Sequence, residues 1–345
     1  MRKIVITLLG LLAGNALVFG QDAMFSQVNQ APMLINPAST GLMDGWERIS
    51  MQHRNQWLGS NGKYNNTMFS FDFNLLKSEM NNNSYIGLGG FFLRDVAGDG
   101  QIGRQSGAVS LSSIIPMGRS GHSISAGLQG GFGSTTLNET ALVFESQWNG
   151  KEFDPTLLSG EQLSNHHSFL DASAGVMYQF DGGSTSFFGS SDVKFQLGAA
   201  VYHFNRPTIN FAAGGTSTLN RKFVFHSSFW KDIPDSDVQY EIDVTQFIQG
   251  KQRATYFGGM LKYKVSNGGN YLGGSNQIGF GLHMRTFDAI VPSFMLKLKG
   301  FRLEVSYDAT ISALRRSPGG GSFELSLSYT NFQDAIFKQR RKYRR

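Results

Sequence analysis

Alternation of apolar and polar residues is the feature that most constrains this chain. Within Ser322–Tyr329 every second residue is large and apolar, and every residue between them is polar. In a β-strand, a period of two sends the apolar side chains to one face and the polar side chains to the other. Such a strand suits a soluble sheet with one wet face. It also suits the wall of a membrane barrel, whose outer face meets lipid and whose inner face meets water.

The same alternation recurs along the chain between turns rich in Gly, Asn, Asp and Ser, and it predicts about fourteen strands. An even number of strands returns both ends of the wall to the same side, as bacterial membrane barrels require. The last strand is expected to pair with the first strand near Ile49–His53. The predicted strands are 46–57, 67–74, 84–93, 105–115, 122–133, 168–180, 193–204, 221–231, 238–246, 255–265, 276–285, 289–299, 301–309 and 321–330.

Composition favours the membrane barrel over the soluble sheet. Aromatic residues make up 13% of the chain although its mean hydropathy is only −0.21, as expected when half of each strand is wet. After residue 20 the sequence has no apolar run of about 20 residues, the length that a membrane helix needs. The absence of Cys excludes a disulfide framework. We therefore predict an all-β protein, a transmembrane antiparallel β-barrel.

The connections between the predicted strands differ in length. Those that follow odd-numbered strands are longer overall than those that follow even-numbered strands. Because outer-membrane barrels have long outer loops and short periplasmic turns, we expect an integral outer-membrane protein with both termini in the periplasm. The long set includes 58–66, 94–104, 134–167, 205–220 and 310–320, and the short set includes 116–121, 232–237 and Gly300.

Four regions are expected. Residues 1–20 resemble a secretory signal, with a basic start and a short apolar core; an uncleaved anchor helix is the alternative. Residues 21–45 contain two prolines and no clean alternation, so they are predicted to be an irregular segment and a possible plug. Residues 46–330 form the barrel. The basic tail 331–345 is expected in the periplasm, either solvated or in contact with lipid head groups or an acidic partner, and not with nucleic acid.

The sequence offers no constellation for catalysis, and we expect no enzyme, no cofactor and no metal site. His166 and His167 are the only histidines close together, and neighbouring residues of a strand point opposite ways. No Gly-x-Ser-x-Gly motif is present. Charged residues on the polar faces are expected to form salt bridges inside the barrel; examples are Asp72, Lys194, Asp243, Lys262 and Glu304.

The connection 134–167 is the most promising surface for a partner. It contains Phe144, Trp148 and Phe153, and a long outer loop rich in apolar residues is typical of a binding surface. The alternative is a loop that folds onto itself over the barrel mouth.

Several motifs resemble the PorP/SprF family. At the N-terminal end they are Phe25-Ser26-Gln27 after Gln21-Asp22, then Asn36-Pro37-Ala38, and then Arg54-Asn55-Gln56-Trp57. Near the C-terminal end they are Ser306-Tyr307-Asp308 and the alternating stretch after Gly320. Many relatives have Tyr after Phe-Ser-Gln, where this chain has Val28. The resemblance makes one set of residues candidates for the family motif and for partner contacts: Phe25, Ser26, Gln27, Asn36, Pro37, Arg54, Gln56 and Trp57.

The resemblance implies an outer-membrane barrel of Bacteroidota-type bacteria that serves the type IX secretion system, often with gliding motility. It implies protein–protein contacts that support secretion or surface attachment of adhesins. The expected partners are outer-membrane or periplasmic components of the system, the secreted adhesin or its C-terminal domain, and membrane lipid. A porin or transporter for small solutes is the alternative.

Overall fold

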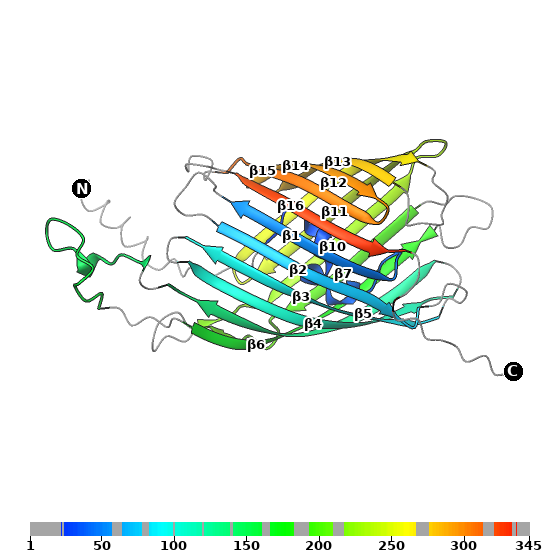
Figure 1. The fold of residues 1–345 in the computed structure, drawn as a ribbon. Helices are drawn as coiled ribbons and strands as arrows, with labels where there is room; N and C mark the ends of the chain where they lie inside the picture. The colour runs from blue at the N-terminus through cyan, green and yellow to red at the C-terminus, as the bar shows by residue number, and fades with distance from the viewer. Residues whose placement is uncertain are drawn as a thin grey trace, which may run out of the picture.

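The computed structural model describes residues 22–332 and 336, apart from gaps at 23, 57–63, 78–82, 99–100, 119–120, 139–140, 161–165, 183–192, 210–216, 267–275, 313–320 and 333–335. Fourteen antiparallel strands close into a single barrel (Figure 1). This confirms the predicted fold class and strand count. Because every wall strand has a neighbour on each side, closure leaves no full-length sheet edge in the membrane.

The strands lie close to their predicted positions. The first seven are β1 (Glu47–Gln56), β2 (Tyr64–Leu75), β3 (Tyr85–Ala97), β4 (Ile102–Pro116), β5 (His122–Thr136), β6 (His166–Asp181) and β7 (Val193–Tyr202). The other seven are β10 (Lys222–Asp232), β11 (Val238–Gln249), β12 (Gln252–Ser266), β13 (Asn276–Arg285), β14 (Ala289–Leu298), β15 (Phe301–Thr310) and β16 (Ser322–Asn331). A small separate sheet pairs β8 (Thr208–Ile209) with β9 (Ser217–Thr218).

The closing pair of strands has the predicted register. Ile49 lies opposite Tyr329, and His53 lies opposite Leu325. The apolar face of β16 points outward, where Leu327 is 47% exposed, whereas Glu324 on the opposite face is fully buried. The same outward apolar pattern runs around the wall, for example at Leu128 and Phe280. This is the surface that lipid covers in a membrane barrel.

One connection differs from the prediction. The stretch 94–104 was expected to be a long loop, but β3 continues to Ala97 and β4 begins at Ile102, so only a short turn remains. The alternation is lost at these strand ends because Arg94 is exposed on the outer face and Leu93 is buried on the inner face. The expected long connections after β5, β7 and β15 are present.

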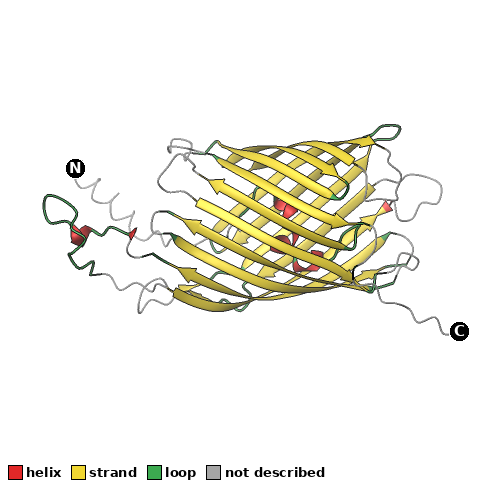
Figure 2. Ribbon diagram, in the orientation of Figure 1, coloured by secondary structure: helices red, strands yellow, loops and turns green. Residues whose placement is uncertain are grey.

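Four short helices lie entirely within the described residues. Three belong to the N-terminal segment, residues 22–45: the 3-10 turns η1 (Val28–Gln30) and η2 (Pro37–Ser39), and the α-helix α2 (Pro32–Ile35). The fourth, η4 (Glu145–Gln147), lies in the connection after β5. Figure 2 shows the helices of the N-terminal segment inside the barrel and the connection after β5 projecting from one end. Among the described residues, no helix has the length and hydropathy needed to cross a bilayer.

We predict that a charge on the outer face destabilises the barrel. Leu128 is 66% exposed in the middle of β5, so Leu128→Arg should cost ~2–4 kcal/mol if it lies near the bilayer midplane. Leu128→Ala is the matched control, because it removes the same side chain without adding a charge. Urea unfolding in lipid vesicles measures both. Equal stability of the Arg and Ala variants would contradict the assignment of this face to lipid.

Candidate functional site: the segment inside the barrel

The N-terminal segment runs through the lumen from one mouth to the other. At one end, Asp22 contacts Lys222, the first residue of β10. At the other end, a backbone hydrogen bond joins Trp46 to Asn331, the last residue of β16. Between these ends most side chains are buried against inward-facing wall residues, including Phe25 and Met33. The segment is therefore a second layer packed inside the wall.

A buried carboxylate holds the first turn of the segment. The two oxygens of Glu324 accept hydrogen bonds from the backbone N–H groups of Ser26 (2.7 Å) and Gln27 (2.8 Å). The side chain of Gln52 on β1 donates to the same carboxylate at 2.7 Å. A carboxylate that accepts several N–H groups makes strong, directional bonds in a buried site. Glu324 thereby fixes the backbone of the segment against the seam between β1 and β16.

Asp308 on β15 extends this anchor. It accepts a hydrogen bond from the Ser26 hydroxyl at 2.6 Å and forms ion pairs with Arg54 (2.9 Å) and Arg285 (3.0 Å). Arg54 also donates to the backbone carbonyl of Met24. Each buried charge thus has an opposite charge or a hydrogen-bonding partner, which is the condition for keeping charges in a barrel interior.

The middle of the segment is held on the opposite wall. Asn36 donates through Nδ2 to the carbonyl of Val176 (2.9 Å) and accepts the backbone N–H of Ala38 through Oδ1 (2.9 Å). The wall has glycine at the points of closest approach: a Cβ added at Gly127 would collide with the Pro37 carbonyl, and one added at Gly175 would collide with Asn36 Oδ1. Glycine is needed there because two backbones approach each other closely.

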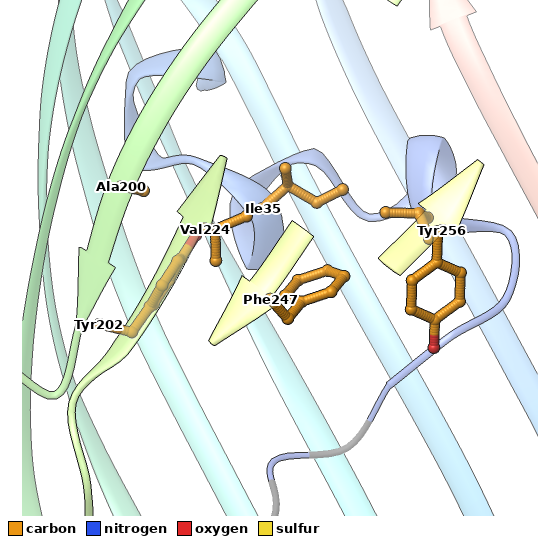
Figure 3. Packing of buried hydrophobic residues seen from close by; sticks show 7 residues of the cluster. Ile35, Ala200, Tyr202, Val224, Phe247 and Tyr256 are labelled. Atoms are coloured by element: carbon orange, nitrogen blue, oxygen red, sulfur yellow. The ribbon is translucent and has the colours of Figure 1, made fainter. Parts of the chain in front are cut away.

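Apolar contacts complete the packing in two clusters. In one cluster, Val28 and Ile35 of the segment pack against Ala200, Tyr202, Val224, Phe247 and Tyr256 of the wall. Figure 3 shows Ile35 directed from the segment toward these strands. In the other cluster, Phe25 and Ala31 pack against Met68 and Leu93. Burial of side chains of this size contributes on the order of 1–3 kcal/mol each.

Asp22 is held by three basic side chains at the mouth. Its carboxylate lies 2.7 Å from Arg104, 2.8 Å from His203 and 2.6 Å from Lys222. Burial alone would raise the pKa of the Asp22 carboxyl, but these three neighbours hold the pKa well below its ordinary value. The carboxylate therefore stays charged at neutral pH, and the segment is tied down at this mouth as well as at its centre.

A cavity of about 780 Å³ lies between the segment and the wall toward the other mouth. Its charged lining is largely paired: Lys194 contacts Asp44 and Asp181, and Lys262 contacts Glu241. The predicted interior salt bridges are thus present at Lys194 and Lys262. Asp72 pairs with Arg48, Asp243 with His283, and Glu304 with Arg302.

The family-motif candidates fall into two groups. Ser26, Gln27 and Arg54 meet at the anchor formed by Glu324 and Asp308, whereas Asn36 and Pro37 contact the opposite wall. Phe25 packs beside the anchor, in the apolar cluster with Met68 and Leu93. Gln56 is half-buried at the end of β1. Trp57 lies outside the described residues.

Phe144, Trp148 and Phe153 lie in the connection after β5, far from the N-terminal segment. There Trp148 and Phe153 form an isolated β-bridge, and Gln147 donates to the carbonyl of Leu157 at 3.0 Å. Trp148 is 57% exposed and Leu158 is 90% exposed. The connection is thus organised by its own hydrogen bonds and leaves apolar side chains in solvent.

Sequence reasoning missed the wall residues that hold the segment. Alternation puts Glu324 on the polar face of its strand but does not identify its partners Ser26, Gln27 and Gln52. It also does not predict that Asp308 and Arg285 form an ion pair. The signal was a charge in the middle of a wall strand on its inner face, because such a charge needs a partner inside the barrel. Within the described part of the chain, no group of three or more His, Asp or Glu side chains is arranged to hold a metal ion.

Comparison with family models gives a match over residues 17–329 to the type IX secretion system membrane protein PorP/SprF. The chain belongs to the PorP/SprF family. The family and the barrel fold both point to the outer membrane and to association with secretion machinery. They also favour a structural role in secretion over catalysis. No curated protein matches the sequence.

Three solved structures with a similar fold show low sequence identity to this chain. A deletion mutant of the TodX monoaromatic hydrocarbon channel has 10% identity and a TM-score of 0.46, with 88% of this chain and 94% of that chain covered. The translocator domain of the autotransporter NalP from Neisseria meningitidis has 11% identity and a TM-score of 0.43, with 88% and 96% covered. A FadL homologue from Pseudomonas aeruginosa has 10% identity and a TM-score of 0.42, with 86% and 92% covered. Values this low carry no argument about function.

We predict that loss of the Glu324 carboxylate loosens the segment. Glu324→Ala leaves the buried N–H groups of Ser26 and Gln27 without acceptors, and each costs ~1–3 kcal/mol. Because the chain has no Cys and Ala31 of the segment is only 3% exposed, a single cysteine introduced at Ala31 reports accessibility. Its maleimide labelling should become at least about ten-fold faster in the Glu324→Ala background.

Ser328→Ala is the control, because Ser328 lies on the same inner face of β16 and makes no hydrogen bond to the described part of the segment. It should leave the labelling rate unchanged. Equal rates in Glu324→Ala and the parent would show that this carboxylate does not hold the segment.

Proposed function

We propose that this barrel is an outer-membrane component of the type IX secretion system that acts through protein–protein contacts and supports secretion or surface attachment of adhesins of the gliding-motility type. The proposal rests on what the family-motif residues contact. Ser26, Gln27 and Asn36 all bond to the wall inside the lumen. The motif therefore serves to hold the segment, and the outer connections are left for partners.

The N-terminal segment acts in this proposal as a plug. It is tied to the wall at Asp22, at the Glu324 anchor and at Gly41, whose N–H donates to Asp72 at 2.8 Å. Anchors at both mouths and at the centre oppose free passage of solutes. This arrangement favours an interaction barrel over the alternative, a porin for small solutes.

The orientation that we propose rests on the connections. The two longest connections between wall strands, after β5 and after β7, are at one mouth, and β16 ends at the other. We place the long connections outside the cell and the basic tail in the periplasm. Asp22 then lies at the outer mouth, because it contacts residues at the beginning of β10 and just after β7. In this proposed orientation the segment runs through the lumen from Asp22 at the outer mouth to β1 at the periplasmic mouth.

The connection after β5 is the proposed partner surface. It carries the exposed side chains of Trp148, Phe153 and Leu158 on a loop organised by its own hydrogen bonds. An exposed apolar group on a preformed loop gains burial when a partner covers it, with little loss of loop entropy. The partner is a secreted adhesin or its C-terminal domain, or a component of the secretion machinery.

Deletion of the gene tests the proposal in cells. We expect loss of one or more secreted adhesins from the cell surface, measured by surface biotinylation and mass spectrometry, and restoration by the wild-type protein. Purification of the intact barrel from detergent-solubilised outer membranes should recover a secretion-system protein or an adhesin. An unchanged surface proteome together with recovery of neither would exclude the proposed role.

Conductance tests the plug. The wild-type barrel in planar bilayers should show little current, and deletion of residues 24–41 should raise single-channel conductance several-fold, because the anchors described above leave the lumen. The deletion variant must retain heat-modifiable gel mobility as evidence of a folded barrel. Equal conductance of the two folded proteins would mean that the segment does not block the lumen.

A further inference from the structure

Strand β6 extends beyond its neighbour β7 at the mouth where β7 ends. On one side, β6 pairs with β5 from His166 to Phe180. On the other side, its pairing with β7 covers only Ala174 to Asp181. On that side the first part of β6 has no paired strand: the connection after β7 runs beside it, and the side chain of His167 donates to the carbonyl of Thr208 at 2.8 Å. We call this unpaired side the open edge.

The direction of the open backbone groups follows from Ala172. Its carbonyl accepts a hydrogen bond from the N–H of Phe204 (3.1 Å), and its own N–H donates to the side chain of Asn205 (3.2 Å). Both bonds point away from β5. Because the backbone of a strand repeats every two residues, the N–H and C=O groups of Leu170 and Ser168 point to the same open side.

The side chain of Asn205 takes the place of a peptide group of a neighbouring strand. Its Oδ1 accepts the N–H of Ala172 and its Nδ2 donates to the carbonyl of Leu170 at 2.8 Å. No other side chain of the described residues replaces a neighbouring strand in this way at Leu170 N–H or at Ser168. Among the described residues, the N–H of Leu170 and both backbone groups of Ser168 on the open side have no hydrogen-bond partner. Ser168 is exposed, and Leu170 is 75% exposed.

We propose that the open edge of β6, residues 168–172, binds an extended segment of a secreted protein by strand addition, with Asn205 and the adjoining residues of the connection after β7, as far as Thr208, displaced by the incoming backbone. This deepens the proposed function and rests on it. Open-edge N–H and C=O groups repeat about every 6.8 Å along a strand. An extended polypeptide backbone matches that spacing, and lipid offers no donors or acceptors in such a row.

The side chains beside the open edge indicate the residue pattern of the bound client segment. In an added strand, side chains continue the two faces of the sheet. The outer face carries the apolar side chain of Leu170, whereas the inner face carries Asp171, whose carboxylate contacts His203 at 2.9 Å. The client segment should therefore alternate apolar residues with polar ones. The connection after β5 lies at the same mouth, so one client can contact both.

Two variants separate backbone pairing from side-chain contact. Leu170→Pro removes the open N–H, and proline is tolerated at an edge whose N–H faces away from the partner strand. Leu170→Ala removes the side chain but keeps the N–H. The probe is the secreted client that co-purifies with the wild-type barrel from native outer membranes. Leu170→Pro should lower its recovery about ten-fold, and Leu170→Ala should lower it much less. Equal losses in the two variants would overturn the proposal.

Asn205→Ala provides a second test if the Pro variant does not fold. It removes the group that competes for Ala172 N–H and Leu170 C=O, so recovery of the client should rise several-fold. Heat-modifiable mobility checks folding of each variant. Unchanged recovery with a folded Asn205→Ala barrel would also overturn strand addition.

Hydrogen exchange distinguishes the failure of this inference from failure of the proposed function. The amides of Ser168 and Leu170 should exchange rapidly in the barrel alone and slowly with the client bound. The amide of Phe169, which faces β5, should be slow in both states. A bound client without protection of Ser168 and Leu170 overturns strand addition and leaves the proposed function standing. Absence of any client overturns both.

Discussion

The structure depends on a carboxylate inside a membrane barrel, that of Glu324. Its two oxygens bind consecutive N–H groups of the N-terminal segment, and its strand closes the wall against β1. The wall must be apolar outside because lipid covers it, so the polar chemistry is concentrated on the inside. An empty lumen would give these charges water as a partner. Here the segment supplies partners for them, so the inward-facing charges of the wall and the polar groups of the segment are matched to one another.

The alternation of residues predicted the wall well, because lipid and water impose a period of two on every strand that separates them. It predicted the pairing of Ile49 with the last strand for the same reason. It failed at 94–104, where the outer face carries Arg94 and the inner face carries Leu93, so apolar and polar residues no longer alternate as they do in the rest of the wall. It did not give the contact between Ser26 and Glu324, which are 298 positions apart. Periodicity shows that Glu324 points inward, but it carries no information about which backbone lies opposite.

The motif of the family has a structural explanation in these contacts. Phe25-Ser26-Gln27 and Asn36-Pro37 are spaced so that the first part contacts the seam of β1, β15 and β16 while the second contacts β5, β6 and β7. The segment thereby joins opposite walls of the barrel. Because the seam exists only after the last strand has paired with the first, these contacts form late in folding.

The point at which the segment joins the wall limits how the lumen can open. The segment is continuous with β1 at the mouth where β16 ends, and Asp22 is fastened at the far mouth. The segment is thus covalently continuous with the wall at the β1 end, whereas its contacts with the wall at Asp22 are noncovalent. If the segment were withdrawn toward β1, Asp22 would travel the length of the lumen while the wall strands stay paired. Opening would then be a sliding withdrawal that requires release of the Asp22 contacts, the Glu324 anchor and the Asn36 contacts, and that leaves the wall closed toward the membrane.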